Sequence, residues 1–501
     1  MNDPSLPNAD IDMQTRQCTL QRILQRRTFL AQGGLSLGGI AAAELLARDA
    51  RAASPVAGPA KVTGLPSGIS GLGAPPHLPQ RVKRVIFLYM SGGPSHLETF
   101  DYKPKLDQLD GQPMPESFTA GQPIAQLQGK ELKVQGHLTK FSQHGSGGLW
   151  LSDFLPHHRR IADKICVVRS MLTEQINHDP AHTFMNTGTA INGRPSLGSW
   201  INYGLGSDSD SLPGFVVLSS VGGRNPQPIS TRQWAAGFLP SRFQGVEFNS
   251  SGDPVHYVRN PPGVSDNLQQ QLIGTIGDLD RHRQSFVDNP ELATRIAAYE
   301  LAFRMQTAVP DLVDMSDEPE HVLRQYGARP GDGSFASNCL LARRLAERGV
   351  RFIQLYHRGW DHHGDLVQHM NTCCGLTDQP TAALLLDLEQ RGMLDETLVI
   401  WGGEFGRTPM FQGKGGPGRD HHIKGFSMWL AGGGIKQGYA HGETDELGYN
   451  SVVNPVHVRD LHATILQQLG IDHQRLSVKY QGLDMRLTGV EPARVVSEIL
   501  A

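Results

Sequence analysis

The stretch Thr397-Leu-Val-Ile-Trp-Gly-Gly-Glu-Phe-Gly-Arg-Thr-Pro409 decides the fold. Its apolar first half is typical of a buried strand, and its glycines then end the strand and present Glu404 and Arg407. A second apolar run, 350–356, ends in the same way. The residues that follow it are Asp361, His362, His363 and Asp365. Because open α/β sheets bind ligands beyond the carboxyl ends of their strands, the two stretches predict one site at one edge of a sheet.

The rest of the chain alternates between strand and helix patterns. Further apolar runs predict strands at 84–90, 164–169, 214–218 and 426–431. Helical patterns occur at 151–162, 289–306, 337–348, 381–391 and 455–469. This alternation predicts an α/β fold with a mostly parallel central sheet and helices on both faces. Residues 107–148 are polar and rich in glycine, and we expect a long loop there.

Composition limits the classes of function. The chain has 501 residues, of which 39% are hydrophobic, and a formal net charge of −3. A packed core is therefore feasible. The sequence has no stripe of basic residues, so nothing in it argues for nucleic-acid binding. The adjacent cysteines Cys373 and Cys374 are expected to be ordinary thiols in a loop, although an exported chain also permits a disulfide.

The N-terminal residues 1–53 resemble a twin-arginine signal peptide. Arg26-Arg27-Thr28-Phe29-Leu30 is followed by a weakly apolar run and by the small-residue site Ala50-Arg51-Ala52. We expect a linker at 54–80 and one domain at 81–501, with a loop insertion at about 221–287. The predicted location is the periplasm or the extracellular space. The partner would be the twin-arginine export machinery, with no stable membrane anchor after cleavage.

Several acidic and histidine residues follow the predicted strands. Asp361, His363 and Glu404 come after two of them, and Asp420-His421-His422 is expected in a later loop. Mixed imidazole and carboxylate ligands suit Zn or Mn better than Ca or Mg, so we predict one or two such divalent ions. Solvated loop charges remain the alternative interpretation. Arg407 either clamps an anion or forms a structural ion pair.

Five motifs together resemble a large bacterial family of exported proteins called domain of unknown function fifteen hundred and one. They are Ser91-Gly-Gly-Pro-Ser-His96, Asn177-His-Asp-Pro-Ala-His182, Trp360-Asp-His-His-Gly364, Gly402-Gly-Glu-Phe-Gly-Arg407 and Asp420-His-His422. The resemblance covers about 84–500. The family is similar in turn to the alkaline phosphatase and sulfatase superfamily, and this similarity implies an alkaline-phosphatase-like fold.

The resemblance also implies roles for single residues. It places Asp361, His363 and either His421 or His422 in one metal site. Glu404 is the acid of a metal motif whose histidine is replaced by Phe405. The superfamily's acid after the first strand is missing here. Residues offered as substitutes or additional ligands are His96, Glu98, Asp101 and His182.

The nucleophile position departs from the superfamily. The frame formed by Pro180 and Thr187-Gly188 puts His178 where sulfatases carry a hydroxyl or thiol. His178 is then a metal ligand or a nitrogen acceptor for a phosphoryl group. The resulting prediction is an exported, metal-dependent hydrolase of phosphate or sulfate esters, small molecules or carbohydrates, with Arg407 binding the anion. The alternative is a non-catalytic or repurposed binding protein that keeps the fold and a metal.

Overall fold

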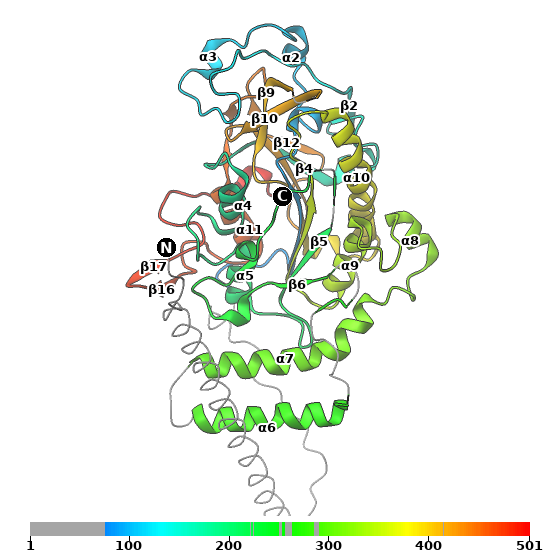
Figure 1. Cartoon of the computed structure of the whole chain (residues 1–501), viewed down its shortest axis with the longest axis vertical. Helices are drawn as coiled ribbons and strands as arrows, with labels where there is room; N and C mark the ends of the chain where they lie inside the picture. The colour runs from blue at the N-terminus through cyan, green and yellow to red at the C-terminus, as the bar shows by residue number, and fades with distance from the viewer. Residues whose placement is uncertain are drawn as a thin grey trace, which may run out of the picture. The chain divides into compact units, whose positions relative to one another are not determined.

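The computed structural model describes residues 76–501 except 221, 224, 250–252, 256–262, 285–289 and 414 (Figure 1). The described residues all belong to one of the chain's two compact units. The predicted signal peptide at 1–53, and the predicted linker as far as residue 75, lie outside the described residues.

A nine-stranded sheet forms the centre of the fold. Its strands, in spatial order, are β12 (Tyr439–His441), β4 (Ile165–Leu172), β11 (Phe426–Gly432), β8 (Thr397–Gly402), β1 (Arg84–Ser91), β7 (Phe352–Arg358), β5 (Phe215–Ser220) and β6 (Val246–Phe248), with β15 (Val456–His457) beside β4. Every pairing is parallel except those of β11, which runs antiparallel to both β4 and β8. The predicted mostly parallel α/β fold is confirmed.

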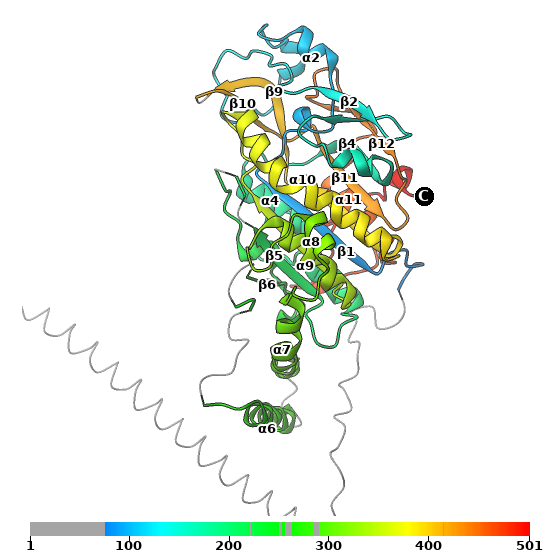
Figure 2. The same ribbon diagram turned by 90° about the vertical axis from the view of Figure 1, so that its right-hand side faces the viewer.

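Helices cover both faces of this sheet. The α-helices are α2 (Pro104–Gln108), α3 (Glu116–Thr119), α4 (His178–Thr187), α5 (Leu197–Leu205), α6 (Asp266–Gln284), α7 (Pro290–Val313), α8 (Glu320–Tyr326), α9 (Phe335–Glu347), α10 (Leu366–Gln390) and α11 (Val458–Gln468). Short 3₁₀ helices are η1 (His96–Glu98), η2 (His158–Lys164), η3 (Thr231–Trp234), η4 (Ser241–Phe243), η5 (Leu394–Glu396) and η6 (Ser497–Ile499). Figure 2 shows α9 and α10 lying across one face.

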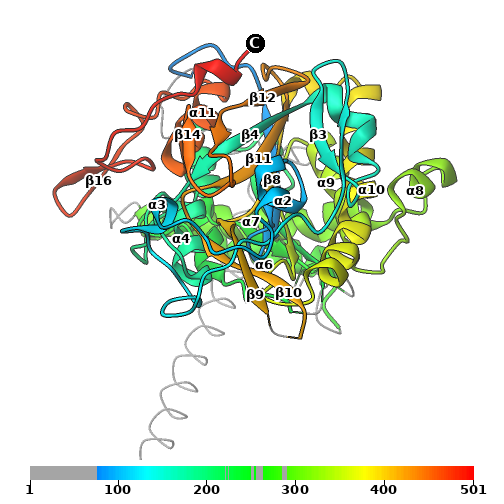
Figure 3. The ribbon, with the colours of Figure 1, turned by 90° about the horizontal axis from the view of Figure 1, so that it is seen from above.

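The alternation of side chains along β1 explains the two layers. Ile86 and Leu88 belong to one buried cluster with residues of α9 and α10. Phe87 and Tyr89 point to the other face and join a second cluster with residues of α4, α5 and α11. Because successive strand residues face opposite sides, an all-apolar strand is buried on both faces. Seen from above, the sheet lies between these two groups of helices (Figure 3).

Four small antiparallel hairpins lie outside the central sheet. They are β2 (Phe141–His144) with β3 (Leu149–Ser152), β9 (Gly406–Gly413) with β10 (Pro417–His422), β13 (Glu443–Thr444) with β14 (Ser451–Val453), and β16 (Val478–Tyr480) with β17 (Leu483–Met485). The β9–β10 hairpin follows β8 directly and carries the last of the predicted site motifs.

Several local predictions were wrong. The helix expected at 151–162 is absent; β3 ends at Ser152 and η2 begins only at His158, after Pro156 has interrupted the segment. The region 107–148 holds the end of α2, and α3 and β2, as well as loop. Part of the expected insertion at 221–287 adds β6 to the sheet edge. Residues 420–422 form part of strand β10 and not a loop.

The adjacent cysteines lie inside α10 and not in a loop. Cys373 and Cys374 are buried free thiols, as are Cys166 and Cys339. Burial raises the pKa of the Cys373 thiol to about 12, so it stays protonated at neutral pH. Among the helices of the described residues, none combines the length and the apolar character that a membrane span requires.

Candidate metal centre

Neighbouring strand ends bring the predicted ligands to one edge of the sheet. Because β11 is antiparallel to β4 and β8, the strands β4, β8 and β7 all point the same way. His178 begins α4, which follows β4. Asp361 and His363 lie between β7 and α10, and Glu404 lies between β8 and β9. His421 lies on β10.

One carboxylate oxygen lies at the centre of this group. Three imidazole Nε2 atoms surround Asp361 Oδ1, at 2.9 Å for His363 and 3.2 Å for both His178 and His421. One ligand atom from each of the four residues lies within 4.8 Å of the others. Atoms held about 2.0–2.2 Å from one zinc ion are about 3–4 Å apart, so the spacing fits a single ion.

Hydrogen bonds at the far side of two rings fix which nitrogen carries the proton. His178 Nδ1 lies 2.7 Å from Glu404 Oε1. His421 Nδ1 lies 2.9 Å from the carbonyl oxygen of Ile176. Carboxylate and carbonyl oxygens only accept, so each Nδ1 must donate its hydrogen. In the neutral rings, both Nε2 atoms are then bare and face Asp361.

His363 follows the same rule through a pair of glutamines. Its Nδ1 lies 2.5 Å from Gln412 Oε1, to which it donates. Its Nε2 lies 3.2 Å from the amide nitrogen of Gln126, so this nitrogen accepts a hydrogen bond and is bare as well. In their neutral forms, all three rings therefore present a bare Nε2 to the same place. Burial opposes ionisation of His178, but its hydrogen bonds to Asp361 and Glu404 outweigh burial and raise its pKa, so this ring holds a proton most readily when no metal is bound. Metal-binding histidines characteristically donate their other N–H to a carboxylate or carbonyl in this way.

The group contains a buried nitrogen that is available to a cation. Among the described residues, His178 Nε2 is buried and has no hydrogen-bond partner. Burial lowers the pKa of His421 to about 4, so its ring is neutral at pH 7 and its lone pair faces the Asp361 carboxylate. Burial opposes ionisation of Asp361, yet the charge of Arg407 and, where a histidine ring is protonated, its Nε2–H hold the pKa of Asp361 far below the usual range. A lone pair beside an ionised carboxylate is repulsive unless a proton or a metal ion lies between them.

Glu404 is not one of the four grouped residues but contacts His178 on the side of the ring that faces away from Asp361. Burial alone would raise its pKa, but His182 and His178 lower it to about 2, so it is ionised. Both of its oxygens accept from Gly92 N, at 3.0 and 3.2 Å. Gly92 has a φ of +126°, and a Cβ there would lie 2.5 Å from the backbone of Asp361, so only glycine fits this approach.

His178, His182 and Glu404 form a second possible ligand group. The two nitrogens of His182 already have partners, with Tyr89 Oη at 2.9 Å and Ser91 Oγ at 3.2 Å. Burial lowers the pKa of His182. This second group is therefore satisfied by hydrogen bonds within the protein, whereas the first is not.

Arg407 lies beneath the site. Its guanidinium is 1% exposed and donates to the carbonyls of Gly92, Gly93, Trp360 and Arg419 as well as to Asp361 Oδ1, the last at 2.7 Å. From the sequence, Arg407 was predicted either to bind an anion or to form a structural ion pair. The contacts place the guanidinium against Asp361, out of reach of an anion that enters from solvent.

Other predicted site residues are buried elsewhere. His422 points away from the group, with its Nε2 2.6 Å from the carbonyl of Tyr449 and its ring stacked on that tyrosine. His96 Nε2 lies 2.8 Å from the carbonyl of Gly448. Asp101 pairs with Lys103 at 3.2 Å and accepts from the Thr444 hydroxyl. Successive residues of a strand face opposite sides, which is why His421 and His422 separate.

The structure adds four residues that sequence reasoning did not single out as partners. Phe405 is fully buried, and its ring lies 4.9 Å from that of His178 and 4.6 Å from that of His421. Gln227 donates to Asp361 Oδ2 at 2.8 Å. Gln126 and Gln412 contact His363 as described above. Glutamines in polar loops carry no periodic signal, so nothing in the sequence distinguished these three from their neighbours.

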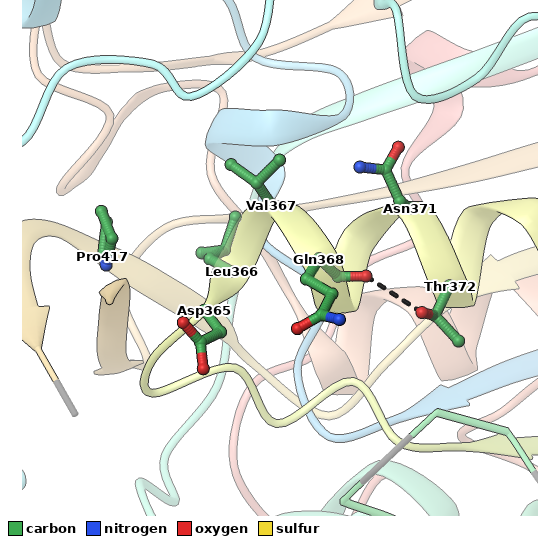
Figure 4. Close-up of a pocket in the computed structure, with 7 residues that line it drawn as sticks. All are labelled: Asp365, Leu366, Val367, Gln368, Asn371, Thr372 and Pro417. Atoms are coloured by element: carbon green, nitrogen blue, oxygen red, sulfur yellow. Dashed lines mark hydrogen bonds between the residues drawn. The ribbon is translucent and has the colours of Figure 1, made fainter. Parts of the chain in front are cut away.

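A cavity of about 540 Å³ opens at the start of α10. Figure 4 shows its lining, which is Asp365, Leu366, Val367, Gln368, Asn371, Thr372 and Pro417. It begins two residues after His363, but none of the four grouped residues lines it.

Comparisons with known proteins give a family model and several similar solved structures. The chain is similar to the solved phosphonate monoester hydrolase from Silicibacter pomeroyi, at 12% identity and a TM-score of 0.31, over 77% of this chain and 73% of that one. A protein in the alkaline phosphatase superfamily from Vibrio parahaemolyticus is similar at 12% identity and a TM-score of 0.32, over 82% and 72% of the two chains.

The alkaline phosphatase from the Antarctic bacterium TAB5 is similar at 11% identity and a TM-score of 0.29, over 74% and 96% of the two chains. Similarities at these TM-scores assign no function. A search of curated protein sequences finds no match. A family model matches residues 82–500, and the chain belongs to that family, which is described as protein of unknown function (DUF1501).

Proposed function

We propose that this protein binds one divalent transition metal ion through His178, Asp361, His363 and His421 and hydrolyses small phosphate or sulfate esters. The observation that carries the proposal is the convergence of three Nε2 atoms on one carboxylate oxygen, in rings whose Nδ1 atoms are held by other acceptors.

The donor set selects the metal. Three imidazole nitrogens and one carboxylate suit Zn, Mn or Fe, whereas Ca and Mg prefer oxygen ligands. We propose one ion and not two, because the hydrogen bonds of Glu404 and His182 are already complete within the protein. When bound, such an ion supplies a Lewis acid that polarises a phosphoryl or sulfuryl oxygen and acidifies water.

The chain's own charges favour an anionic substrate. Asp361 and Glu404 are the two carboxylates of the site, and Arg407 offsets one of them. A divalent ion would leave the centre net positive. The ten-residue helix α4 starts at His178, so its amino end also faces the site. Helix amino ends favour negative groups through their free N–H groups and dipole.

The side chains of this site have other roles than those of a hydrolase that uses a hydroxyl group as its nucleophile. His178 is a metal ligand, because its Nδ1 is held by Glu404 and its Nε2 faces Asp361. Glu404, Ile176 and Gln412 orient the three rings through Nδ1, and Gln227 orients Asp361. Phe405 packs against two of the rings and excludes water from that side. Water is then the attacking group, and the active-site side chains form no covalent intermediate.

The second candidate function is a metal-binding protein without hydrolytic activity. Four protein ligands already complete a tetrahedral shell, which is the usual arrangement of a structural zinc site. Catalytic zinc sites use three protein ligands and keep one position open. The ligand count of this site therefore favours the binding function if the ion takes four-coordinate geometry.

Metal content and ester turnover together test both candidates. We expect one ion per chain in the purified protein, and its loss in His421→Ala. His144→Ala is the matched control, because His144 lies on β2, outside the site. Its metal content should equal that of the wild type. A metal-free wild type would overturn the site itself.

Turnover of an aryl phosphate and an aryl sulfate then separates the two functions. A hydrolase should turn over one of these esters only with metal bound, and His421→Ala should lose the activity. A protein that holds its ion but cleaves neither ester supports the binding function instead.

Export is proposed separately from the site. It rests on Arg26 and Arg27 in residues 1–53 and on the small-residue site at 50–52. Fractionation of a bacterium that makes the full chain should find a shortened protein outside the cytoplasm. Arg26→Lys with Arg27→Lys should hold the full-length chain inside.

A further inference from the structure

The loop that carries Gln126 is anchored on one side of the metal group. Leu127 is 3% exposed and packs in a cluster with Val134 and Met410. Its backbone N–H donates to Asp420 Oδ2 at 2.8 Å. Asp420 directly precedes His421 on β10. The loop is thus fixed to the strand that supplies a ligand, while the side chain of Gln126 remains exposed.

A closed ring of hydrogen bonds sets the direction of the Gln126 amide. His363 Nδ1 donates to Gln412 Oε1. Gln412 Nε2 then donates to Gln126 Oε1 at 3.2 Å. Gln126 Nε2 in turn lies 3.2 Å from His363 Nε2. Turning one amide alone would bring two donors or two acceptors together, and turning both would require His363 to carry its hydrogen on Nε2. In the arrangement that the structure shows, the N–H of Gln126 points at His363 Nε2.

We infer that Gln126 is the residue that holds a small oxyanion at this centre and so orients the ester substrate. The inference rests on the proposed function. The lone pair of His363 Nε2 can serve only one partner at a time. When it serves a metal ion, the N–H of Gln126 loses its acceptor and faces a centre that is net positive. An entering oxyanion supplies that acceptor.

The character of the side chain supports this role. Gln126 is neutral, so it can donate to an oxyanion without competing with it for the metal. It is exposed, so its release from His363 costs no buried hydrogen bond. Gln412 is 3% exposed and fixes the amide from behind. The alternative role is a brace that only holds His363 in place, and this alternative makes a different prediction.

The experiment measures anion binding to the full chain loaded with Co²⁺, using inorganic phosphate and azide as probes and visible absorption as the readout. In Gln126→Ala we expect phosphate affinity to fall about tenfold or more, as for loss of a hydrogen bond to a charged group. The affinity for Co²⁺ should stay within about threefold of wild type, because no metal ligand is removed. Gln128→Ala is the matched control, since Gln128 is exposed in the same loop.

A second variant, Gln126→Glu, keeps the size of the side chain and should weaken phosphate further by like-charge repulsion. Equal phosphate affinities in wild type, Gln126→Ala and Gln128→Ala would overturn the inference and leave the metal site standing. Loss of Co²⁺ from Gln126→Ala would also overturn it, in favour of the brace. A wild type that binds no Co²⁺ would refute the proposed function itself.

Discussion

Two buried carboxylates, Glu98 and Asp361, have different surroundings. Glu98 is fully buried, and Arg419 donates to it from Nε at 2.9 Å and from Nη2 at 2.7 Å, while the Ser95 hydroxyl also donates. Asp361 receives one donor from Arg407 and one from Gln227. Its Oδ1 also faces three imidazole Nε2 atoms, in rings whose Nδ1 atoms donate to other residues.

This difference separates a structural ion pair from a binding site. The Glu98 carboxylate accepts hydrogen bonds from Arg419 and Ser95, so the Glu98–Arg419 ion pair needs no ligand to complete it. Around Asp361 the neutral rings leave acceptors facing one another, and the balance is met only by protons on the rings or by a cation. A folded protein tolerates such a deficit where a ligand supplies the missing positive charge. Burial and charge alone do not distinguish the two carboxylates; the count of donors and acceptors does.

Removing the partner of Glu98 should have the largest effect. Arg419→Met leaves a buried carboxylate without its cation, and we expect the free energy of unfolding of the metal-free protein to fall by about 3–5 kcal/mol. Urea unfolding measures it. The double variant Glu98→Leu with Arg419→Met should recover most of the loss. A single variant as stable as wild type would show that Glu98 is not held in the way described here.

Removing metal should give the next largest effect, and only at the Asp361 site. At a free metal concentration of 100 to 1,000 times Kd, binding stabilises the folded chain by about 2.7–4.1 kcal/mol. A chelator should therefore lower the stability of wild type by that amount, measured by urea unfolding. His421→Ala should not respond to the chelator, whereas His144→Ala should respond as wild type does. An equal response in all three proteins would place the stabilising ion elsewhere.

Glu404→Gln should have a smaller effect. The variant keeps an acceptor for His178 but removes the charge, and loss of such an outer partner typically weakens metal affinity about 10–100-fold. Competition with a chromophoric chelator measures the change. Glu389→Gln is the control, because Glu389 pairs with Lys164 at the surface. Complete loss of metal would instead make Glu404 a direct ligand, as its sequence motif implied.

Acidification should give the smallest effect and should act through Glu98. Burial alone would raise the pKa of Glu98, but Arg419 outweighs it and the pKa is lowered. A lowered pKa in the folded state adds stability above the ordinary Glu value, about 4.3, that is lost as pH falls through the folded value. Each unit of lowering is worth about 1.4 kcal/mol. Below about pH 4.3, metal-free wild type should lose stability more steeply than the Glu98→Leu, Arg419→Met double variant. Parallel pH profiles would contradict this.

The sequence predicted the elements whose side-chain pattern matches their burial. β1, β7 and β8 are buried on both faces and read as apolar runs, and Glu404 and Asp361 follow two of them at the predicted edge. α10 was harder, because Pro380 resembles a helix start. The helix in fact begins at Leu366 and continues through that proline.

The choice of ligands could not be made from sequence. β10 consists of Pro, Gly and four polar or charged residues, so no apolar pattern predicts a strand there. Arg419 and His422 are nevertheless buried there by partners from distant segments. Without the strand, nothing distinguished His421 from His422. The role of Gln126 depends on contacts with two other segments and was equally hidden.

The spread of the ligands along the chain has a consequence for protein synthesis. The hydrogen bond that orients His421 joins residues 245 positions apart. Of the four proposed ligands, the first 300 residues contain only His178. A ribosome must therefore pass residue 421 before the last ligand emerges. Metal uptake would follow that point, and an ion at this centre would mark a chain in which segments 245 positions apart have come together.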